Sequence, residues 1–419
     1  MIVFKFGGAS VKDAEAVRNV AEILKGHADQ EVVVVVSAMG KTTNALEKVI
    51  EEIFAEEGNP ETRIREIEQF HAEIIDDLFG KSAGEMYAVS DKIFSYLRQR
   101  ITSQADNDYP QAYDQLVSVG ELLSTKIVST YLNHVNLANE WLDARKLVIT
   151  DKNFMEAKVD WEQSDLAISR QFSKTGNTKL WVTQGFIGGT TDQFITTLGR
   201  EGSDYSAAIF ANILDAEKLV IWKDVPGVLN ADPKHFSNTE LLPNISYREA
   251  VELSYYGASV IHPKTLKPLQ NKGIPLEVRS FEDTKAKGTL INENGDSDKL
   301  LPSYILKSPQ ILISISPKDY SFMVEEHLSE VFAQFAKHKV KINIMQNSAL
   351  SFSASVDGPI SKVDPLIKAL SGSFRVKFND DLHLLTIRHY NEQTVNELVK
   401  GREILLEQKT RETIRFLIR

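Results

Sequence analysis

The chain has 419 residues, of which 42% are apolar and 25% are charged, as in an ordinary globular protein with room for two or three domains. It contains no cysteine, which excludes disulfide frameworks, thiolate zinc sites and cysteine nucleophiles. The net charge of -10 disfavours a general attraction to nucleic acid or anionic lipid, and no apolar stretch is long enough to span a membrane. Because the N-terminus also has no signal-peptide pattern, we expect a cytoplasmic protein.

The first eleven residues, MIVFKFGGASV, predict a buried strand, a Gly-Gly turn and a helix. Lys5 is the one charged residue of the strand and lies at its carboxyl end, where open α/β sheets bind ligands. Gly7 and Gly8 let the backbone approach a ligand, and a helix over about 13–24 would direct free N–H groups to the same place. The pattern indicates an anion site. The alternative is an ordinary strand-turn-helix corner with Lys5 reaching solvent.

The next segments repeat this pattern of strand, turn and helix. Residues 31–37 contain five successive valines, which is typical of a parallel strand buried on both faces, and a glycine-containing turn follows at 38–44. Helical periodicity, broken into three pieces, predicts a helical insertion over about 45–115. Glu121 begins the next helix, where its carboxylate is either a cap or a ligand for a cation.

A later loop, with the sequence LGREGSDYS, is the second basis for the prediction. Gly199 and Gly202 flank Arg200, while Ser203 and Asp204 begin an alanine-rich helix. A guanidinium, a hydroxyl and a carboxylate therefore converge at one helix N-terminus. An aspartate at this place is usually a cap, but an arginine in a glycine loop indicates an anionic partner.

Two regions follow from the order of the elements. Alternating strands and helices up to residue 292 predict an α/β domain with a doubly covered, mostly parallel sheet over 1–292. After a polar linker, residues 311–378 predict a complete βαββαβ unit of ferredoxin type, and residues 382–419 predict part of a second. Small sheets of this kind often pair with one another, so we expect a homodimer through the region 300–419.

The motifs that are missing narrow the chemistry. The chain has no P-loop, no Gly-x-Gly-x-x-Gly and no His-Glu-x-x-His sequence. His262, before Pro263, is more readily explained as a structural hydrogen-bonding residue than as a base. Glycine loops at helix starts, together with lysine, arginine, aspartate and serine, are typical of phosphoryl transfer by positioning and charge neutralisation.

Six segments, in order along the chain, resemble those of the aspartate kinases in the amino acid kinase superfamily: KFGGASV, SAMGKTTN, SVGE, TLGREGSDYS, WKDVPG and YGASVIHP. The resemblance covers residues 1 to about 292, and the tail resembles the paired ACT regulatory modules of that family. It implies phosphorylation of the side-chain carboxylate of L-aspartate by ATP, the first step of lysine, threonine and methionine biosynthesis. Mg²⁺ would be bound through ATP, without direct protein ligands.

The resemblance also implies a role for each matching residue. Lys5 would lie between the γ-phosphate and the aspartate side chain, and Asp204 would orient it. Residues expected to hold aspartate, with Glu121 on its ammonium and Arg200 on its α-carboxylate, are Thr43, Glu121, Phe186, Arg200 and Ser203. Residues expected to border the nucleotide are Gly7, Gly8, Ser10, Ser37, Asp224, Leu229, Lys234 and Ser259.

Four positions depart from the family pattern. A usual lysine is Ser259 here, a usual threonine is Lys223, a frequent tyrosine is Leu229 and a common glycine is Glu201. We expect Lys223 to be catalytic in place of the missing lysine, because it projects from the carboxyl end of a strand into the ligand crevice. The alternative is a solvated strand-end charge in a weak or inactive enzyme.

The tail is expected to hold an effector, either lysine or threonine. The strand pair of ACT modules that would bind it carries Asn343, Ile344, Gln346, Asn347 and Ser348, unless these residues only cover a sheet face. Two other functions remain open, which are a superfamily kinase for another amino acid and a catalytically impaired regulatory homologue that binds amino acids. The expected partners are L-aspartate and ATP, with neither nucleic acid nor a membrane.

Overall fold

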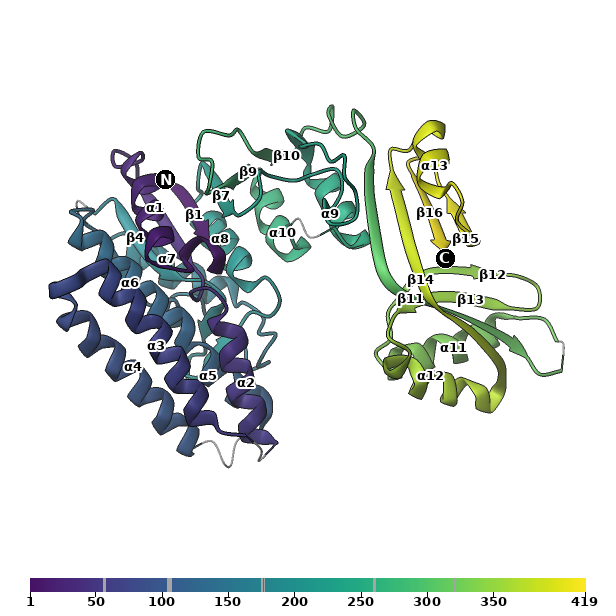
Figure 1. Ribbon diagram of the computed structural model, residues 1–419, viewed down its shortest axis with the longest axis horizontal. Coiled ribbons are helices and arrows are strands. Elements are labelled where there is room, and N and C mark those ends of the chain that lie inside the picture. Colours follow the sequence, from purple (N-terminus) through teal and green to yellow (C-terminus); the bar gives the residue numbers. More distant parts are fainter. Residues whose placement is uncertain (56–57, 104–107, 175, 177, 259–260, 320) are drawn as a thin grey trace. The chain divides into compact units, whose positions relative to one another are not determined.

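Figure 1 shows the computed structural model, which describes residues 1–55, 58–103, 108–174, 176, 178–258, 261–319 and 321–419. The chain divides into two compact units. The first comprises Met1–Val228, Pro243–Val251 and Ile261–Gly295, and the second comprises Leu229–Leu242, Glu252–Val260 and Asp296–Arg419. Across the described ranges, no helix combines the length and the apolar character that a membrane crossing requires.

An eight-stranded sheet forms the centre of the first unit, in the order β3-β4-β2-β1-β7-β9-β10-β8. Its parallel strands are β1 (Ile2–Phe6), β2 (Val32–Val36), β3 (Glu140–Leu142), β4 (Leu180–Gln184), β7 (Lys218–Lys223) and β9 (Leu276–Ser280). At one edge β10 (Thr289–Asn292) runs antiparallel to β9, and β8 (Asn244–Ser246) is parallel to β10. The predicted α/β class with a mostly parallel sheet is confirmed.

Helices and one hairpin complete this unit. Its helical segments are η1 (Gly8–Val11), α1 (Ala14–Lys25), α2 (Thr42–Phe54), α3 (Pro60–Phe79), η2 (Gly80–Ser82), α4 (Gly84–Ser103), α5 (Tyr109–Val117), α6 (Val119–His134), η4 (Ala144–Lys146), α7 (Trp161–Phe172), α8 (Gly202–Ile213), α9 (Tyr247–Tyr256), whose last five residues belong to the second unit, and α10 (Pro263–Lys272). The hairpin pairs β5 (Ile187–Gly189) with β6 (Ile195–Thr197). The helices of the expected insertion over about 45–115 are α2 to α5, and α6 is the separate helix expected near Glu121.

Successive side chains of the central strand β1 point to opposite faces of the sheet and lie in two different environments. Phe4 and Phe6 are fully buried in the core that also contains residues of α1 and α6. Lys5 points to the opposite face, where α8 packs against β1, β2 and β7. A period of two along one strand therefore places a single ammonium group between the sheet and α8.

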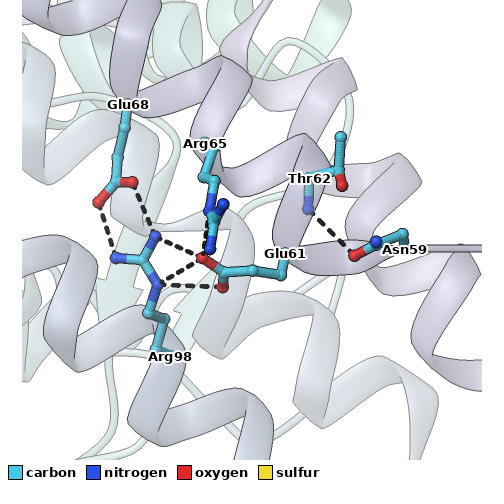
Figure 2. Close-up of polar contacts among 6 residues, drawn as sticks. All are labelled: Asn59, Glu61, Thr62, Arg65, Glu68 and Arg98. Atoms are coloured by element: carbon cyan, nitrogen blue, oxygen red, sulfur yellow. Dashed lines mark hydrogen bonds and ion pairs between the residues drawn. The ribbon is translucent and has the colours of Figure 1, made fainter.

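Arg98 of α4 joins α4 to α3 in the helical insertion, as Figure 2 shows. Its guanidinium donates to both carboxylate oxygens of Glu68, at 2.7 Å each, and to Glu61 at 3.0–3.3 Å. These bonds raise the pKa of Arg98 above its ordinary value. Asn59 caps the start of α3 by accepting the backbone N–H of Thr62 at 3.2 Å.

We expect Arg98→Met to lower the free energy of unfolding by about 1 kcal/mol, because both glutamates lose their shared partner while water still screens these partly exposed groups. The measurement is a urea titration followed by circular dichroism. Arg65→Met is the matched control, since Arg65 makes one exposed bond to Glu61 at 3.2 Å and its loss should change little. Equal losses in the two variants would contradict a special contribution from Arg98.

The second unit contains a six-stranded sheet in the order β12-β13-β11-β14-β16-β15. Its strands are β11 (Ser303–Pro317), β12 (Ile342–Asn347), β13 (Phe352–Asp357), β14 (Phe374–Arg388), β15 (Ile404–Lys409) and β16 (Thr413–Ile418). Its other helices are α11 (Glu325–Lys337), α12 (Ile360–Ser373) and α13 (Glu392–Val399). The order from β11 to β14 is the βαββαβ order expected for residues 311–378.

Two long strands, β11 and β14, pass through both halves of this sheet (Figure 1). Residues 310–317 pair with 374–382, whereas 303–307 pair with 384–388, next to β16. The second half therefore includes a strand that precedes the first half in the sequence. Residues 382–419 contain the expected strand, short helix, strand and strand, and residues 303–307 of β11 add a further strand to this half from outside the expected bounds.

Candidate active site

The turns that follow the central strands lie together along the edge of the first sheet that the carboxyl ends of these strands form. β1 lies between β2 and β7, and its last residue, Phe6, is opposite Val36, the last residue of β2, and Trp222, the residue before the end of β7. The backbone N–H of Gly40 donates to the carbonyl oxygen of Gly8 at 3.0 Å. A Cβ atom on Gly8 would lie 2.7 Å from the Gly40 oxygen, so this close approach requires glycine.

A cavity of about 590 Å³ opens at this edge. It brings together ten of the residues that the sequence singles out: Lys5, Gly8, Ser37, Thr43, Glu121, Phe186, Arg200, Ser203, Asp204 and Lys223. The rest of its lining consists of Ala38, Gly40, Glu47, Tyr113, Met155, Glu156, Gly199, Glu201 and Gly202. Residues as far apart in the sequence as Lys5 and Lys223 thus form one polar cavity, at the place where a parallel sheet binds its ligand.

Two lysines share one buried carboxylate in this cavity. Lys5 Nζ lies 2.5 Å from Asp204 Oδ1, and Lys223 Nζ lies 3.8 Å from Asp204 Oδ2. Burial alone would raise the pKa of Asp204, but attraction to the two ammonium groups outweighs it and holds that pKa below its ordinary value. Asp204 is therefore ionised and balances one of the two positive charges.

Glu121 is a buried carboxylate without a cationic neighbour among the described residues. It is 2% exposed, its Oε1 accepts the N–H of Ala38 at 3.4 Å, and its Oε2 has no hydrogen-bond partner within the described part of the chain. Burial raises the pKa of Glu121 to about 8. A carboxylate held in this way binds a cationic group strongly, because the ligand then satisfies a desolvated charge.

The loop before α8 presents Arg200 to the same cavity. Arg200 is exposed and forms no ion pair with the part of the chain that the structure describes. The next residue, Glu201, has a φ of 54°, a left-handed conformation that favours glycine, and its Oε2 accepts the N–H of His262 at 2.9 Å. This bond connects the corner at His262 to the loop before α8.

Five described residues that were predicted to border the nucleotide are not among those that line the cavity. Ser10 is buried and donates to the carbonyl oxygen of Trp222 at 3.3 Å, and its expected contact with the phosphates stays a prediction. Gly7 lies next to Lys5, and Asp224 is exposed beyond the end of β7. Leu229 and Lys234 belong to the second unit, and Ser259 lies outside the described residues.

The first helix lies close to its expected range of about 13–24, since α1 spans Ala14–Lys25. The turn Gly8–Val11 is a separate 3-10 segment, and α1 begins only at Ala14. Asp13 caps α1, since its carboxylate accepts the N–H of Ala16 at 2.8 Å. Asp13 thus supplies an anionic partner to the N-terminus of α1, and the anion-binding role expected of this helix stays a prediction. The helix starts that contribute residues to the cavity include those of α2, with Thr43, α6, with Glu121, and α8, with Gly202, Ser203 and Asp204.

Sequence reasoning missed a hydrogen-bonded pair on the cavity wall. The Tyr113 hydroxyl donates to Glu47 Oε1 at 2.7 Å. Glu47 lies one helical turn after Thr43 on α2, so an i, i+4 reading of that helix would have found it. Tyr113 has no comparable signal, because its contact spans 66 residues.

Asp114, beside Tyr113, was also missed. Its buried carboxylate accepts the N–H of Met155 at 3.0–3.1 Å and both the N–H and the hydroxyl of Thr197, at 2.9 and 2.6 Å. Burial raises the pKa of Asp114 to about 6 against the effect of these hydrogen bonds. Asp114 thereby fixes the segment at Met155 that lines the cavity.

One sequence pattern has no part in the site. Residues 80–84 match the Gly-x-Ser-x-Gly pattern of hydrolase nucleophiles. The structure places Gly80–Ser82 in η2, between helices α3 and α4, with Ser82 exposed. Because such a nucleophile requires a strand-turn-helix corner, Ser82 is an ordinary loop residue.

The expected effector residues differ in their accessibility. Asn343 is bonded within its own unit, donating to Gln310 and Asp357 and accepting from Lys307, all at 2.8 Å. The side chain of Ile344 is buried in the core. The members of the set that remain exposed are Gln346, Asn347 and Ser348.

Comparisons of this chain with a family model, with related sequences and with solved structures all point to the same family. The model of the Amino acid kinase family matches residues 1–280. The chain is 30% identical over 394 residues to Lysine-sensitive aspartokinase 3 of Escherichia coli, which covers 92% of this chain and 86% of that enzyme. Crystal structures of E. coli aspartokinase III with lysine and aspartate, and with aspartate and ADP, each superpose with a TM-score of 0.82 at 28% identity. They cover all of this chain and 95% and 96% of those chains.

The match therefore extends over both units. The family model covers most of the first unit, and the two crystal structures also cover the six-stranded sheet that follows it. The family expected from the six sequence segments is confirmed. The chain belongs to the aspartokinases of the amino acid kinase family.

Proposed function

We propose that this chain transfers the γ-phosphoryl group of ATP to the side-chain carboxylate of L-aspartate, giving L-4-phosphoaspartate and ADP. A carboxylate oxygen forms a bond to the γ-phosphorus, while the bond from that phosphorus to the β,γ-bridging oxygen breaks. The electron pair of the broken bond stays on ADP. The attacking carboxylate is already ionised at neutral pH, so the reaction needs no general base.

One observation carries this proposal. The buried Glu121 carboxylate and the Arg200 guanidinium line the same cavity as Lys5. An α-amino acid presents one cation and one anion, and Glu121 and Arg200 offer one partner of opposite sign for each. Thr43, Phe186 and Ser203 line the remaining space around the amino acid. The E. coli enzyme in complex with aspartate and ADP supports the choice of aspartate and ATP as substrates.

Lys5 is the candidate catalytic residue, and Asp204 holds it in position by the 2.5 Å ion pair. Gly8 and Ser37 border the path of the phosphates, with Gly7, Asp224, Leu229, Lys234 and Ser259 proposed for the nucleotide beyond them. Among the described residues no group of three or more His, Cys, Asp or Glu is arranged for a metal ion. Mg²⁺ would be held mainly by ATP oxygens, as is usual for this ion, and would neutralise phosphate charge near Asp204.

The second unit is proposed to regulate the first. The E. coli relative is lysine-sensitive and has been crystallised with lysine, which supports lysine as the effector over threonine. Gln346, Asn347 and Ser348 are the exposed residues proposed to contact it. A homodimer through the ACT region and a cytoplasmic location complete the proposal. Light scattering and a lysine titration of the activity test the assembly and the effector.

An ADP-release assay tests the activity directly. ADP should accumulate in the presence of L-aspartate, ATP and Mg²⁺, and L-glutamate should support less than about 1% of that rate, because an extra methylene displaces the carboxylate from the in-line position. Preference for glutamate would indicate another kinase of the superfamily. Binding of aspartate without ADP release would instead indicate a regulatory protein.

A further inference from the structure

A second cavity, of about 450 Å³, lies in the first unit between helices α2 and α3. Among the described residues, none lines both this cavity and the active-site cavity, although α2 contributes to each of them. Thr43 and Glu47 of α2 line the active site, whereas another face of the same helix lines the second cavity. A cavity of this volume accommodates a small molecule. Aspartate and ATP would bind in the active-site cavity and do not account for this second one.

Apolar side chains form one part of the wall of the second cavity. Ala45 of α2 lines it together with Ile67 and Phe70 of α3, which are three residues apart and lie on one face of that helix. Ile67 is buried and Phe70 is half-buried. The Phe70 ring lies beside the turn before α2, since a Cβ atom on Gly40 would be 3.3 Å from Phe70 Cζ. This part of the wall offers an apolar ring or a branched chain a surface on which to pack.

Basic side chains form another part of the wall. Lys41 and Lys48 are seven residues apart, so they lie on the same face of α2, and Arg63 of α3 lines the same cavity. The Arg63 Nε donates to Glu52 Oε1 at 2.9 Å, whereas neither lysine forms an ion pair with the residues that the structure describes. Glu66 is the one acidic residue among the described lining residues. With Arg63 paired to Glu52, the two lysines against Glu66 leave one positive charge.

We propose that this cavity is a second ligand site, for a small monocarboxylate that carries one apolar ring. The two lysines of α2 extend on flexible four-carbon stems and pair with the carboxylate, while the ring packs on Ile67 and Phe70. The single positive charge that remains in the lining matches a monoanion, and the apolar wall favours an organic anion over inorganic phosphate. This inference goes beyond the proposed function and does not depend on it.

The test uses para-fluorophenylacetate as the probe and fluorine NMR of the full chain as the measurement. The probe should bind with a Kd of about 1 mM, which is typical of a ligand of this size at a partly exposed site. Para-fluorophenylacetamide, which has the same shape without the charge, should bind at least about 10-fold more weakly. Inorganic phosphate should displace the probe only at concentrations at least about 10-fold above the Kd of the probe, because it cannot use the apolar wall.

Variants of the lining should change the affinity in opposite directions according to charge. Combining Lys41→Met with Lys48→Met should weaken probe binding about 10-fold, and Glu66→Gln should strengthen it about 3-fold. Lys92→Met is the matched control, because Lys92 is an exposed lysine of α4 in the same helical insertion and does not line the cavity. It should leave the Kd unchanged. Thermal unfolding of all variants shows whether the fold is retained.

Three outcomes would overturn the inference. The first is the absence of binding at probe concentrations about 20-fold above the expected Kd. The second is equal affinity for the carboxylate and the amide, since the lysines would then have no part in binding. The third is binding that Arg200→Met abolishes and the double lysine variant keeps, because the probe would then occupy the active-site cavity. A failure to release ADP from aspartate and ATP would contradict the proposed function and leave this binding test unaffected.

Discussion

Replacing Lys5 by methionine is expected to lower kcat about 10³-fold and to leave the KM for aspartate nearly unchanged. Lys5 meets charge that changes during phosphoryl transfer, so its loss raises the barrier without removing a ground-state contact to the amino acid. Steady-state kinetics with varied aspartate at saturating ATP provide the measurement. An expected loss of about 10³-fold corresponds to about 4 kcal/mol in the activation free energy.

The control for Lys5→Met tests whether the variant keeps its fold at the site. Removing Lys5 leaves Asp204 buried with Lys223 as its remaining ion-pair partner among the described residues, and an under-compensated buried carboxylate is destabilising. Thermal unfolding should therefore accompany the kinetics. Lys25→Met, on the exposed end of α1, should show neither effect. A Lys5→Met enzyme that is folded and retains its kcat would remove Lys5 from the catalytic site.

The second large effect is a pH dependence of the KM for aspartate, which follows from the protonation of Glu121. Burial raises the pKa of Glu121 to about 8 in the empty enzyme, so below that pH most molecules carry a proton on this carboxyl. The substrate ammonium binds the ionised form, and a proton must therefore be released on binding. The KM for aspartate should fall about tenfold per pH unit between pH 6 and 7 and become constant above about pH 8.5.

Glu121→Gln isolates this effect. At pH 8.5 the variant should have a KM for aspartate about 10²-fold higher, because the substrate ammonium loses a charged partner in a desolvated site. Its KM should no longer depend on pH between 6 and 8. The KM for ATP is the internal control and should not change. A pH profile identical to that of the unmodified chain would show that another group titrates.

Much of the fold of the first unit could be predicted from the sequence, because the residue patterns that determine it are local. The five valines of β2 and the alternation around Lys5 predict buried parallel strands, and glycine next to a strand end predicts a turn that approaches a ligand. The edge strand β8 and its neighbour β10 were not predicted. They are three and four residues long, and their pairing is set by partners distant in the sequence.

The residues of the candidate site likewise fall into those that the sequence predicts and those that it does not. Lys5, Arg200 and Asp204 follow from residue type and position at a strand end or helix start. The Tyr113–Glu47 bond and the Asp114 contacts could not be predicted, because they join segments 41 to 83 residues apart with no periodic pattern. The Asp204 bridge between two lysines likewise depends on a strand register that only the folded sheet provides.

The two long strands of the second unit have a consequence for synthesis on the ribosome. Residues 303–307 of β11 pair with 384–388 of β14, so about 80 residues must be translated before these residues find their partners. At typical elongation rates of about 5–20 residues per second, this delay lasts about 4–16 s. The intervening βαββαβ unit has its own core and can fold during that interval. We therefore expect the half of the sheet that contains β12 and β13 to form first in the nascent chain. The half that contains β15, β16 and residues 303–307 then pairs with strands that are already in place.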